Sequence, residues 1–232
     1  MKKCLIVLLI LLNSLFSLYA LESKYRIDGK SYNKQIFDDQ NNQITNFKNW
    51  ELITAFYVSP DNTKMLVYHR PDKSKAYLIT LYDLKSKKIL AECEPGFACF
   101  GVQWTDNYLI YKWGATGRGM SFEYRNYDNL KVEKTVTALI SFEDFEDDIL
   151  IKSSYFYFEK EIIFHKYSDG TVLKTVDCVE ELRHKGIDTN AISVFGIEKT
   201  GKRKYKFSIS YYLSSNGKED EVHEMVLELK LE

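Results

Sequence analysis

The stretch that decides the fold runs from Ser59 to Leu90 and reads SPDNTKMLVYHRPDKSKAYLITLYDLKSKKIL. It is typical of two strands, a loop, a third strand ending in Tyr82-Asp83, and a turn. β-branched and aromatic residues favour strands, because their side chains cover a half-buried pleated surface. Aspartate and asparagine favour turns, because their side chains accept hydrogen bonds from the backbone that follows. The stretch therefore predicts short strands joined by tight turns.

Similar strands recur along the chain at intervals of about 40 to 43 residues. The strand MLVYH (Met65–His69) is followed by YLIYK (Tyr108–Lys112), DILIK (Asp148–Lys152) and AISVFGIEK (Ala191–Lys199). Four short strands in a period of about 40 to 45 residues are the signature of a β-propeller blade. Five such copies fit the chain, and the first lacks its opening strand, for which YRID (Tyr25–Asp28) is the earliest candidate.

The third strand of each copy ends in an aromatic residue followed by an acid. These pairs are Phe37-Asp38, Tyr82-Asp83, Tyr127-Asp128 and Tyr167 with Asp169. We expect the aromatic ring to close the strand against a neighbouring sheet and the acid to open the turn by bonding its own downstream backbone. Gly170 and Gly217 supply positive φ angles in two of the later turns.

One segment breaks the strand pattern. The sequence DCVEELRHKG (Asp177–Gly186) predicts a short helix, with Asp177 as the N-cap, Glu180 three residues later and Gly186 at the end. It stands where the fifth copy would have its first strand. The helix is either inserted between two blades or replaces that strand.

Residues Val58–Lys134 resemble WD40-like blades of the kind found in the propeller of TolB and of prolyl oligopeptidase relatives. The matching elements are Ser59-Pro60-Asp61, the apolar strand after it and Tyr82-Asp83-Leu84, while the second copy has Trp104-Thr105-Asp106 instead. The resemblance implies an all-β, small propeller-like fold of about five blades, either closed or incomplete and open. It implies a fold and not an activity.

The N-terminus has the pattern of a secretory signal peptide over residues 1–20. Lys2 and Lys3 precede the apolar run Cys4–Leu12, and Ala20 suits cleavage. The alternative is an uncleaved membrane anchor. Cleavage would leave a single domain over residues 21–232 with no stable membrane insertion. The composition, rich in Lys, Asn and Ile, suggests a bacterial protein in the periplasm or outside the cell.

Three cysteines would remain after cleavage, in a compartment that permits disulfides. Cys93 and Cys99 stand on either side of the Pro95-Gly96 turn in CEPGFAC, and a disulfide between them is one interpretation. The other is that these two and Cys178 are small buried apolar residues.

The sequence contains no motif that predicts catalysis. It has no GxSxG, HExxH or P-loop pattern, and its four histidines lack the spacing of metal ligands, so we expect no cofactor and no metal. The net charge of −1 with interspersed signs argues against nucleic acid. The acidic run Glu143–Asp148 and the basic run Gly201–Lys206 are interpreted as solvated turns.

The leading functional hypothesis is therefore a non-enzymatic protein that binds a protein partner, an inhibitor or immunity protein being one variant. Its candidate binding residues are Trp104, Trp113 and Arg118, the last two in the glycine-rich loop WGATGRGM, because Trp and Arg are the residue types that anchor interfaces. The alternative is a carbohydrate-binding or carbohydrate-cleaving propeller that uses aromatic platforms and carboxylates such as Asp106 and Glu123.

Overall fold

The computed structural model describes residues 24–30, 32–47, 51–115, 119–153, 160–189, 192–213 and 221–231. The predicted signal peptide, Gly217 and Arg118 lie outside these residues. Two compact units divide the chain: one runs up to Trp104 and includes Asn126–Lys131, and the other comprises Thr105–Arg125 and the residues from Val132 onward. One domain over residues 21–232 stays a prediction.

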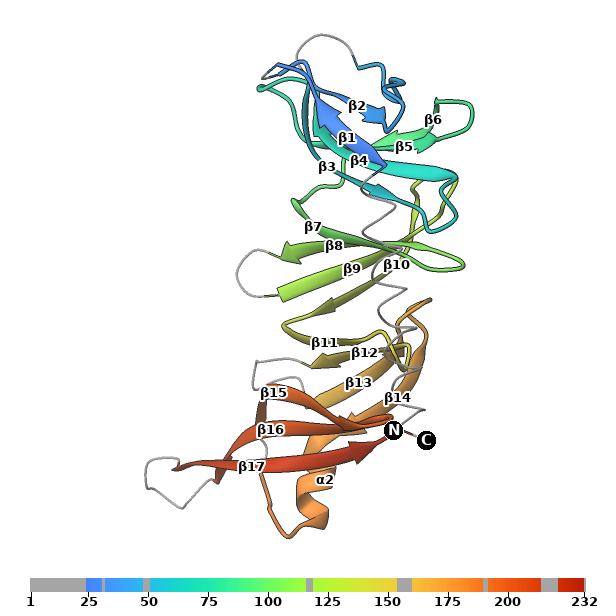
Figure 1. The fold of residues 1–232 in the computed structure, drawn as a ribbon. Coiled ribbons are helices and arrows are strands. Elements are labelled where there is room, and N and C mark those ends of the chain that lie inside the picture. The colour runs from blue at the N-terminus through green and yellow to red at the C-terminus, as the bar shows by residue number, and fades with distance from the viewer. Residues whose placement is uncertain are drawn as a thin grey trace. The chain divides into compact units, whose positions relative to one another are not determined.

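The strands of the described residues form five sheets, each a meander in chain order (Figure 1). In order, these are β1 (Tyr25–Asp28) and β2 (Gln35–Asp38); β3 (Leu52–Val58), β4 (Lys64–Arg70), β5 (Leu78–Asp83) and β6 (Lys88–Cys93); β7 (Cys99–Trp104), β8 (Leu109–Ala115), β9 (Gly119–Arg125) and β10 (Val132–Ala138); β11 (Ile140–Asp144), β12 (Ile149–Ser153), β13 (Glu161–Lys166) and β14 (Val172–Asp177); and β15 (Ile192–Gly201), β16 (Lys204–Leu213) and β17 (Glu221–Lys230).

Three sheets of four strands, each folded as an antiparallel meander, are blades of the propeller type. The sequence-based prediction of an all-β propeller-like fold of about five blades is confirmed. Among the described residues the first sheet has two strands and the last has three. For the first sheet, an incomplete copy also follows from the sequence, which lacks an opening strand there.

The central strands are buried because both of their faces are covered. Met65, Leu66 and Val67 of β4 are fully buried in sequence, as are Ile149, Leu150 and Ile151 of β12. An unbroken apolar run, rather than alternation, is what a strand buried on both faces requires. In the second unit, Phe164 of β13 and Tyr205 and Phe207 of β16 extend this core from one sheet to the next.

In the last sheet, the order of the strands differs from the sequence-based prediction. Ala191–Lys199 resembles the second strand of each copy, but β15 is the first strand of its sheet. The Arg203 amide, in the turn from β15 to β16, donates a hydrogen bond to Asp147, in the turn from β11 to β12. The turn from β11 to β12 joins the first strand of its sheet to the second, so the turn from β15 to β16 is matched to a turn of that kind. The last blade therefore contains a first, a second and a third strand, and its fourth strand is missing from the described residues.

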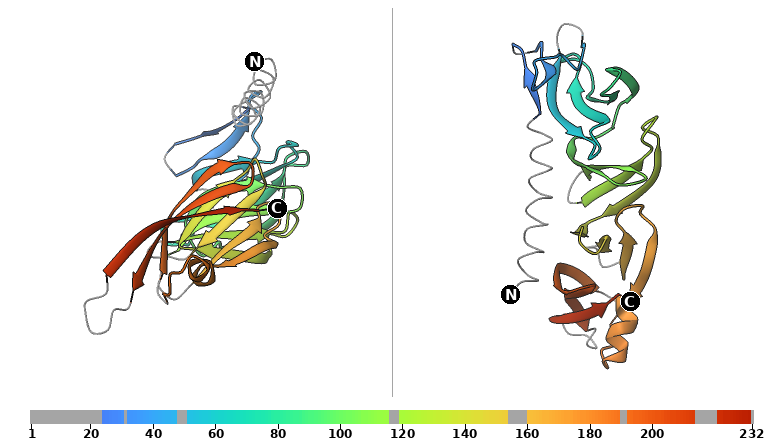
Figure 2. Two further views of the ribbon diagram at one scale, coloured as in Figure 1. Left: turned by 90° about the horizontal axis from the view of Figure 1, so that it is seen from below. Right: turned by 45° about the vertical axis from the view of Figure 1, so that its right-hand side comes forward.

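This assignment also decides where the helix belongs. Helix α2 (Cys178–His184) lies between β14 and β15, so it is inserted between two blades and does not replace a first strand. Its Val179 and Leu182 join the apolar core of β15 and β16, and Figure 2 shows α2 beside these strands. As predicted, the Asp177 carboxylate caps it by accepting from the amides of Val179 and Glu180, and Gly186 follows its end at a φ of 80°.

No helix of the described residues is long and apolar enough to cross a membrane.

Replacing Asp177 with Ala should lower the free energy of unfolding by about 1 kcal/mol, because two helix amides lose their acceptor. Urea denaturation followed by fluorescence measures this. Asp177→Asn keeps the acceptor and should stay near the wild type, whereas an equal loss in both variants would contradict a capping role. Asp188→Ala, at an exposed position after the helix, is the matched control.

Candidate functional site

The aromatic–acid turns lie at strand ends where they hold neighbouring segments together. Asp83 accepts a hydrogen bond from the Ser86 amide at 2.6 Å, and Asp169 accepts one from the Thr171 amide at 2.8 Å. Each acid thus organises the turn that follows it, as predicted. Tyr82 and Tyr167 are buried, as expected for rings that close a strand end, whereas Phe37 and Tyr127 are half-buried.

In the first unit the turn at Tyr127-Asp128 is joined to β4. Lys64 donates to Asp128 at 2.9 Å, and its ammonium lies 5.4 Å from the ring centroid of Tyr127. That ring stacks on Trp104, with 5.8 Å between the centroids. Because Asp128 is 82% exposed, the ion pair itself contributes less than about 1 kcal/mol, and the aromatic stack supplies most of this contact.

In the second unit the acidic run Glu143–Asp148 is not the solvated turn that its composition suggests. Glu143 accepts from Lys112 at 3.0 Å and from the hydroxyl of Tyr167 at 2.8 Å. Asp148 accepts from the amide and the hydroxyl of Ser168. Of the five acids, the side chain of Glu146 alone is largely exposed, at 84%. The run is a structural joint, because its carboxylates bind residues that are distant in the sequence.

The centre of this joint is Lys199 of β15. Its ammonium lies 2.8 Å from Asp144, 2.8 Å from Asp147 and 3.1 Å from Glu146. The side chains of Asp144 and Asp147 are only 4% and 5% exposed, so each depends on Lys199 for its counter-charge. Tyr205 donates its hydroxyl to Asp144 at 2.7 Å, and the Arg203 amide donates to Asp147 at 2.9 Å.

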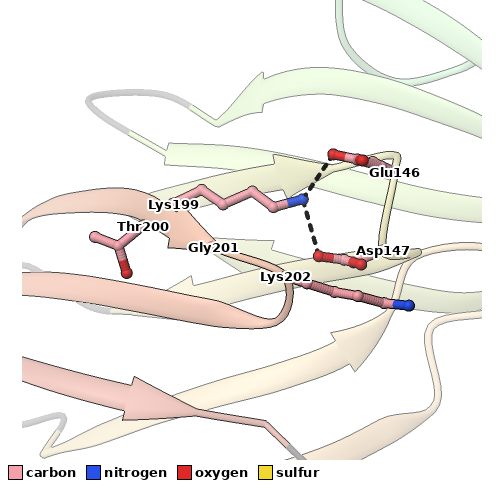
Figure 3. A pocket seen from close by; sticks show the side chains of 6 residues that line it. All are labelled: Glu146, Asp147, Lys199, Thr200, Gly201 and Lys202. Carbon is pink, nitrogen blue, oxygen red and sulfur yellow. Dashed lines mark hydrogen bonds and ion pairs between the residues drawn. The ribbon is translucent and has the colours of Figure 1, made fainter. Parts of the chain in front are cut away.

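An open depression of about 560 Å³ lies beside this ion cluster. Its lining residues are Glu146, Asp147, Lys199, Thr200, Gly201 and Lys202 (Figure 3). Figure 3 shows the Lys199 side chain extending to Glu146 and Asp147, so the charged groups of the lining neutralise one another.

The electrostatics of the depression do not suit an acid catalyst. The ion pair with Lys199 and the bond from the Arg203 amide hold the pKa of Asp147 below its usual range. Burial opposes the charge of Lys199, but its hydrogen bonds to Asp144, Asp147 and Glu146 outweigh burial and raise its pKa. A glycoside hydrolase needs a carboxylic acid whose pKa is raised, which is the opposite direction from that of Asp147.

Replacing Lys199 with Met should lower the free energy of unfolding by about 2–3 kcal/mol, because two nearly buried carboxylates lose their counter-charge. Urea denaturation at neutral pH measures the loss. Lys202→Met removes a lysine from the same depression, at an exposed position, and should change the stability by less than about 0.5 kcal/mol.

The pH dependence of the same variant provides a second readout. Because the folded-state pKa of Asp147 is lowered, its contribution is present above the unfolded-state pKa of about 4 and is lost as the pH falls through the folded-state value. The difference in stability between wild type and Lys199→Met should therefore shrink in acid. A difference that stays constant from pH 7 to pH 3 would contradict the ion-pair account.

The first unit carries a different candidate site, which we call the aromatic surface: Tyr57, Tyr68, Tyr77, Phe97 and Phe100. Tyr68 and Tyr77 stack with 4.8 Å between ring centroids, and the Arg70 guanidinium lies 5.5 Å from the Tyr77 centroid. The Tyr57 hydroxyl lies 3.7 Å from Cys99 Sγ. Phe97 is 45% exposed and Phe100 is 68% exposed, on either side of Cys99.

Phe97 and Phe100 are the exposed rings of this group, whereas Tyr68 is buried and Tyr57 and Tyr77 are half-buried. Apolar side chains that lie exposed in a group, with polar groups beside them, mark interaction sites. Arg70 is held in place by hydrogen bonds to the Lys73 and Lys75 carbonyl oxygens, so it presents a fixed cation next to the rings. Aromatic and arginine side chains of this kind are the residues that dominate binding energies.

The sequence-based predictions do not include this surface. Phe97 and Phe100 lie in and beside the segment CEPGFAC, whose most evident feature is its pair of cysteines. The available signal was the placement of two phenylalanines at and beside a Pro-Gly turn, where polar residues are the norm.

The first unit also contains a buried polar chain around His69. His69 Nδ1 contacts the Glu51 carboxylate, His69 Nε2 lies 2.6 Å from the Thr80 hydroxyl, and that hydroxyl donates to Glu92 at 2.7 Å. The hydroxyl, the imidazole and the first carboxylate have the order of a nucleophile, a base and an orienting acid. Thr80 and His69 are 0% and 1% exposed, so no substrate reaches them and the chain of bonds is structural.

Two of the three predicted binding residues are described, and they belong to different units. Trp104 belongs to the first unit and stacks on Tyr127. Trp113 lies half-buried in β8 of the second unit, opposite Ser121. Arg118 lies outside the described residues. A binding role for the three stays a prediction.

The two carboxylates of the carbohydrate alternative have different surroundings. Asp106 is exposed in the turn before β8, while Glu123 accepts from the Arg125 guanidinium at 2.9 Å. Within the described residues, no group of three or more His, Cys, Asp or Glu side chains is arranged to hold a metal ion.

The Cys93–Cys99 disulfide stays a prediction. If it forms, the mature protein without residues 1–20, and hence without Cys4, should gain one label, on Cys178, when it is unfolded in the presence of an alkylating agent. It should gain three labels after reduction. Mass spectrometry of the two samples makes the measurement. Three labels without reduction, in protein recovered from an oxidising compartment, would contradict the pairing.

The fold defines a class, that of proteins built from propeller-type blades. No family model matches the chain, and no curated protein matches it. Among solved structures, an uncharacterised protein from Listeria monocytogenes has a TM-score of 0.45 at 14% identity, over 88% of this chain and 63% of its own. BamB from Moraxella catarrhalis has a TM-score of 0.42 at 5% identity, over 81% and 60%.

A third similar structure, Hsv2 from Kluyveromyces lactis, has a TM-score of 0.39 at 12% identity, over 82% of this chain and 58% of its own. The chain thus spans less than two thirds of each of these three structures. Because all three TM-scores lie below 0.5, the proposals that follow rest on the residues of this chain alone.

Proposed function

We propose that this is an exported, non-enzymatic, propeller-like protein that binds another protein of the cell envelope or the extracellular space. The observation that carries the proposal is the exposure of two phenylalanine rings of the aromatic surface, Phe100 at 68% and Phe97 at 45%. An inhibitor or immunity protein is the variant of this function in which the partner is itself a toxic enzyme.

The chemistry of the surface fits a protein partner. Phe97 and Phe100 offer apolar area that a partner can cover, and burying a phenylalanine side chain stabilises a complex by about 1.5–3 kcal/mol. Arg70, beside Tyr77, adds a cation that can bind a carboxylate of the partner. An apolar centre with a charged group at its rim is the usual composition of a protein interface.

The polar groups of the molecule favour a binding role over catalysis. The carboxylates beside the open depression converge on Lys199 and are neutralised by it. The Thr80–His69–Glu51 chain is sealed inside the first unit. Both arrangements are complete as structural features, and neither needs a substrate to satisfy its charges.

The proposed location follows from the sequence of residues 1–20, which has the features of a signal peptide. Export would place the aromatic surface in the periplasm or outside the cell, where a disulfide between Cys93 and Cys99 would hold the segment that carries Phe97.

A carbohydrate ligand is the second candidate function, because sugars also bind to exposed aromatic rings. The observation that favours it is the half-buried ring of Tyr77, which lies beside the hydrogen-bonding guanidinium of Arg70. It differs from the leading proposal in its ligand and not in its surface.

The double substitution Phe97→Ser with Phe100→Ser should weaken partner capture at least tenfold, because two exposed anchors are lost. The measurement is affinity capture from envelope and extracellular fractions, with proteins quantified by mass spectrometry. Phe195→Ser removes a phenylalanine of equal exposure, 45%, from β15 in the second unit, and is the matched control.

Recovery of the same partners with the double variant would refute binding through the aromatic surface. Binding of the wild type to a glycan array, lost in the double variant and without any captured protein, would replace the protein partner with the carbohydrate. Trp113→Ala tests the sequence-based site in the same assay, and unchanged recovery would remove Trp113 from the proposal.

A further inference from the structure

The outer edge of β17 is the end of an incomplete sheet. In each of the three complete sheets a fourth strand follows the third, whereas no described strand pairs with the outer side of β17. The backbone amides and carbonyls along this side therefore form a row of hydrogen-bonding groups that another strand can pair with.

The complete sheets protect their outer strands, and the last sheet does not. β6, β10 and β14 are six or seven residues long, and each is paired with its neighbour through an irregular register. Short length and bulges are the devices by which proteins prevent edge strands from pairing. β17 is ten residues long and pairs with β16 in an unbroken register from Glu221 to Lys230.

The side chains of β17 are sorted between its two faces. Its exposed face carries Val222, Glu224, Val226, Glu228 and Lys230, in strict alternation with less exposed residues. The other face turns Met225, Leu227 and Leu229 toward the apolar core of the last sheet. A strand added at this edge must continue both faces, because a shift of one residue would exchange them.

The charges of the exposed face indicate which strand fits. Lys230 stands directly opposite Lys204 of β16, and like charges in this position are unfavourable. A carboxylate on the outer side of Lys230 would relieve the repulsion. β17 itself carries one six residues earlier, at Glu224.

A second copy of β17, running antiparallel about a twofold axis at Leu227, meets this requirement. Each Glu224 then stands opposite Lys230 of the other copy, Met225 opposite Leu229 and Val226 opposite Glu228. The neighbouring register, centred on Val226, places Glu224 opposite Glu228 twice and is unfavourable. The charges thus distinguish one self-pairing register from the next.

We propose that the protein forms a symmetric dimer by pairing β17 with β17 of a second copy, centred on Leu227. The two three-stranded sheets become one continuous sheet of six strands, and each exposed edge is covered by the other. This dimer uses residues of the second unit and is independent of partner binding at the aromatic surface.

Charge reversal tests both the dimer and its register. The mass of the purified full-length chain is measured by light scattering after size exclusion, over a series of concentrations. The wild type should reach twice the single-chain mass. Glu224→Lys and Lys230→Glu should each weaken association about tenfold or more, because twofold symmetry turns two attractive pairs into two repulsive ones.

The double variant Glu224→Lys with Lys230→Glu restores both pairs with their signs exchanged and should dimerise like the wild type. Lys174→Glu, an equal charge change on the exposed strand β14, is the matched control and should leave the dimer intact. Thermal unfolding of each variant shows that it is folded, which keeps loss of structure apart from loss of pairing.

Three results would overturn the proposal. The first is a wild type that keeps the single-chain mass at every concentration. The second is single variants that dimerise as well as the wild type. The third is a double variant that remains a monomer although it folds, because that result would remove the pairing of Glu224 with Lys230.

Discussion

The ion cluster around Lys199 is the interaction on which the second unit depends. One ammonium from β15 neutralises Asp144 and Asp147, whose side chains are almost fully buried, and Tyr205 donates its hydroxyl to the first of them. Leaving a buried carboxylate without its counter-charge costs far more than a surface ion pair contributes. The strand β15 is therefore held at one position against the turn between β11 and β12.

Elsewhere in each unit, single hydrogen bonds also join segments that are distant in the sequence. Thr105 donates its hydroxyl to the Ser168 carbonyl at 2.9 Å, and in the first unit Tyr25 donates to Asn62 at 3.0 Å. The first contact joins two turns that follow different strands, and the second joins the start of β1 to the turn between β3 and β4. A hydrogen bond contributes about 1 kcal/mol, so each contact is modest, and their importance lies in fixing neighbouring sheets in register.

The groups that are available to bind a ligand are different from the groups that hold the structure together. The titratable groups with the most extensive bonding form two separate clusters, one around Lys199 and one around His69. The members of each cluster bind one another. The groups that are available to a ligand are apolar or aromatic, at Phe97 and Phe100, or belong to the backbone, at the edge of β17. This distribution is the physical reason for the proposal that the protein binds a partner.

Much of the fold could be predicted because its rules are local. The aromatic–acid turns and the cap at Asp177 depend on residues that lie within a few positions of each other, and the period of about 40 residues can be read directly from the spacing of similar strands. The position of each strand in the last blade could not be predicted in this way. Ala191–Lys199 has the composition of a second strand, and only its pairing shows that it is a first strand.

The candidate site was less accessible from the sequence than the fold. The residue type of Trp113 predicts a binding role, yet Trp113 lies half-buried within a sheet. Phe97 and Phe100 are not among the predicted binding residues, yet they are exposed. Residue type predicts what a side chain is able to bind, but exposure depends on the strands that cover it, and these come from elsewhere in the chain.

The sequence by itself determined the class of fold, the turn chemistry and the helix, because hydrogen bonds between near neighbours and the period of apolar residues specify them. The tertiary structure alone decided that the acids of Glu143–Asp148 are bonded rather than solvated, because their partners lie up to 61 residues away. It also decided that, among the described residues, no fourth strand pairs with β17, because strand order depends on pairing over long distances and is not contained in any local pattern.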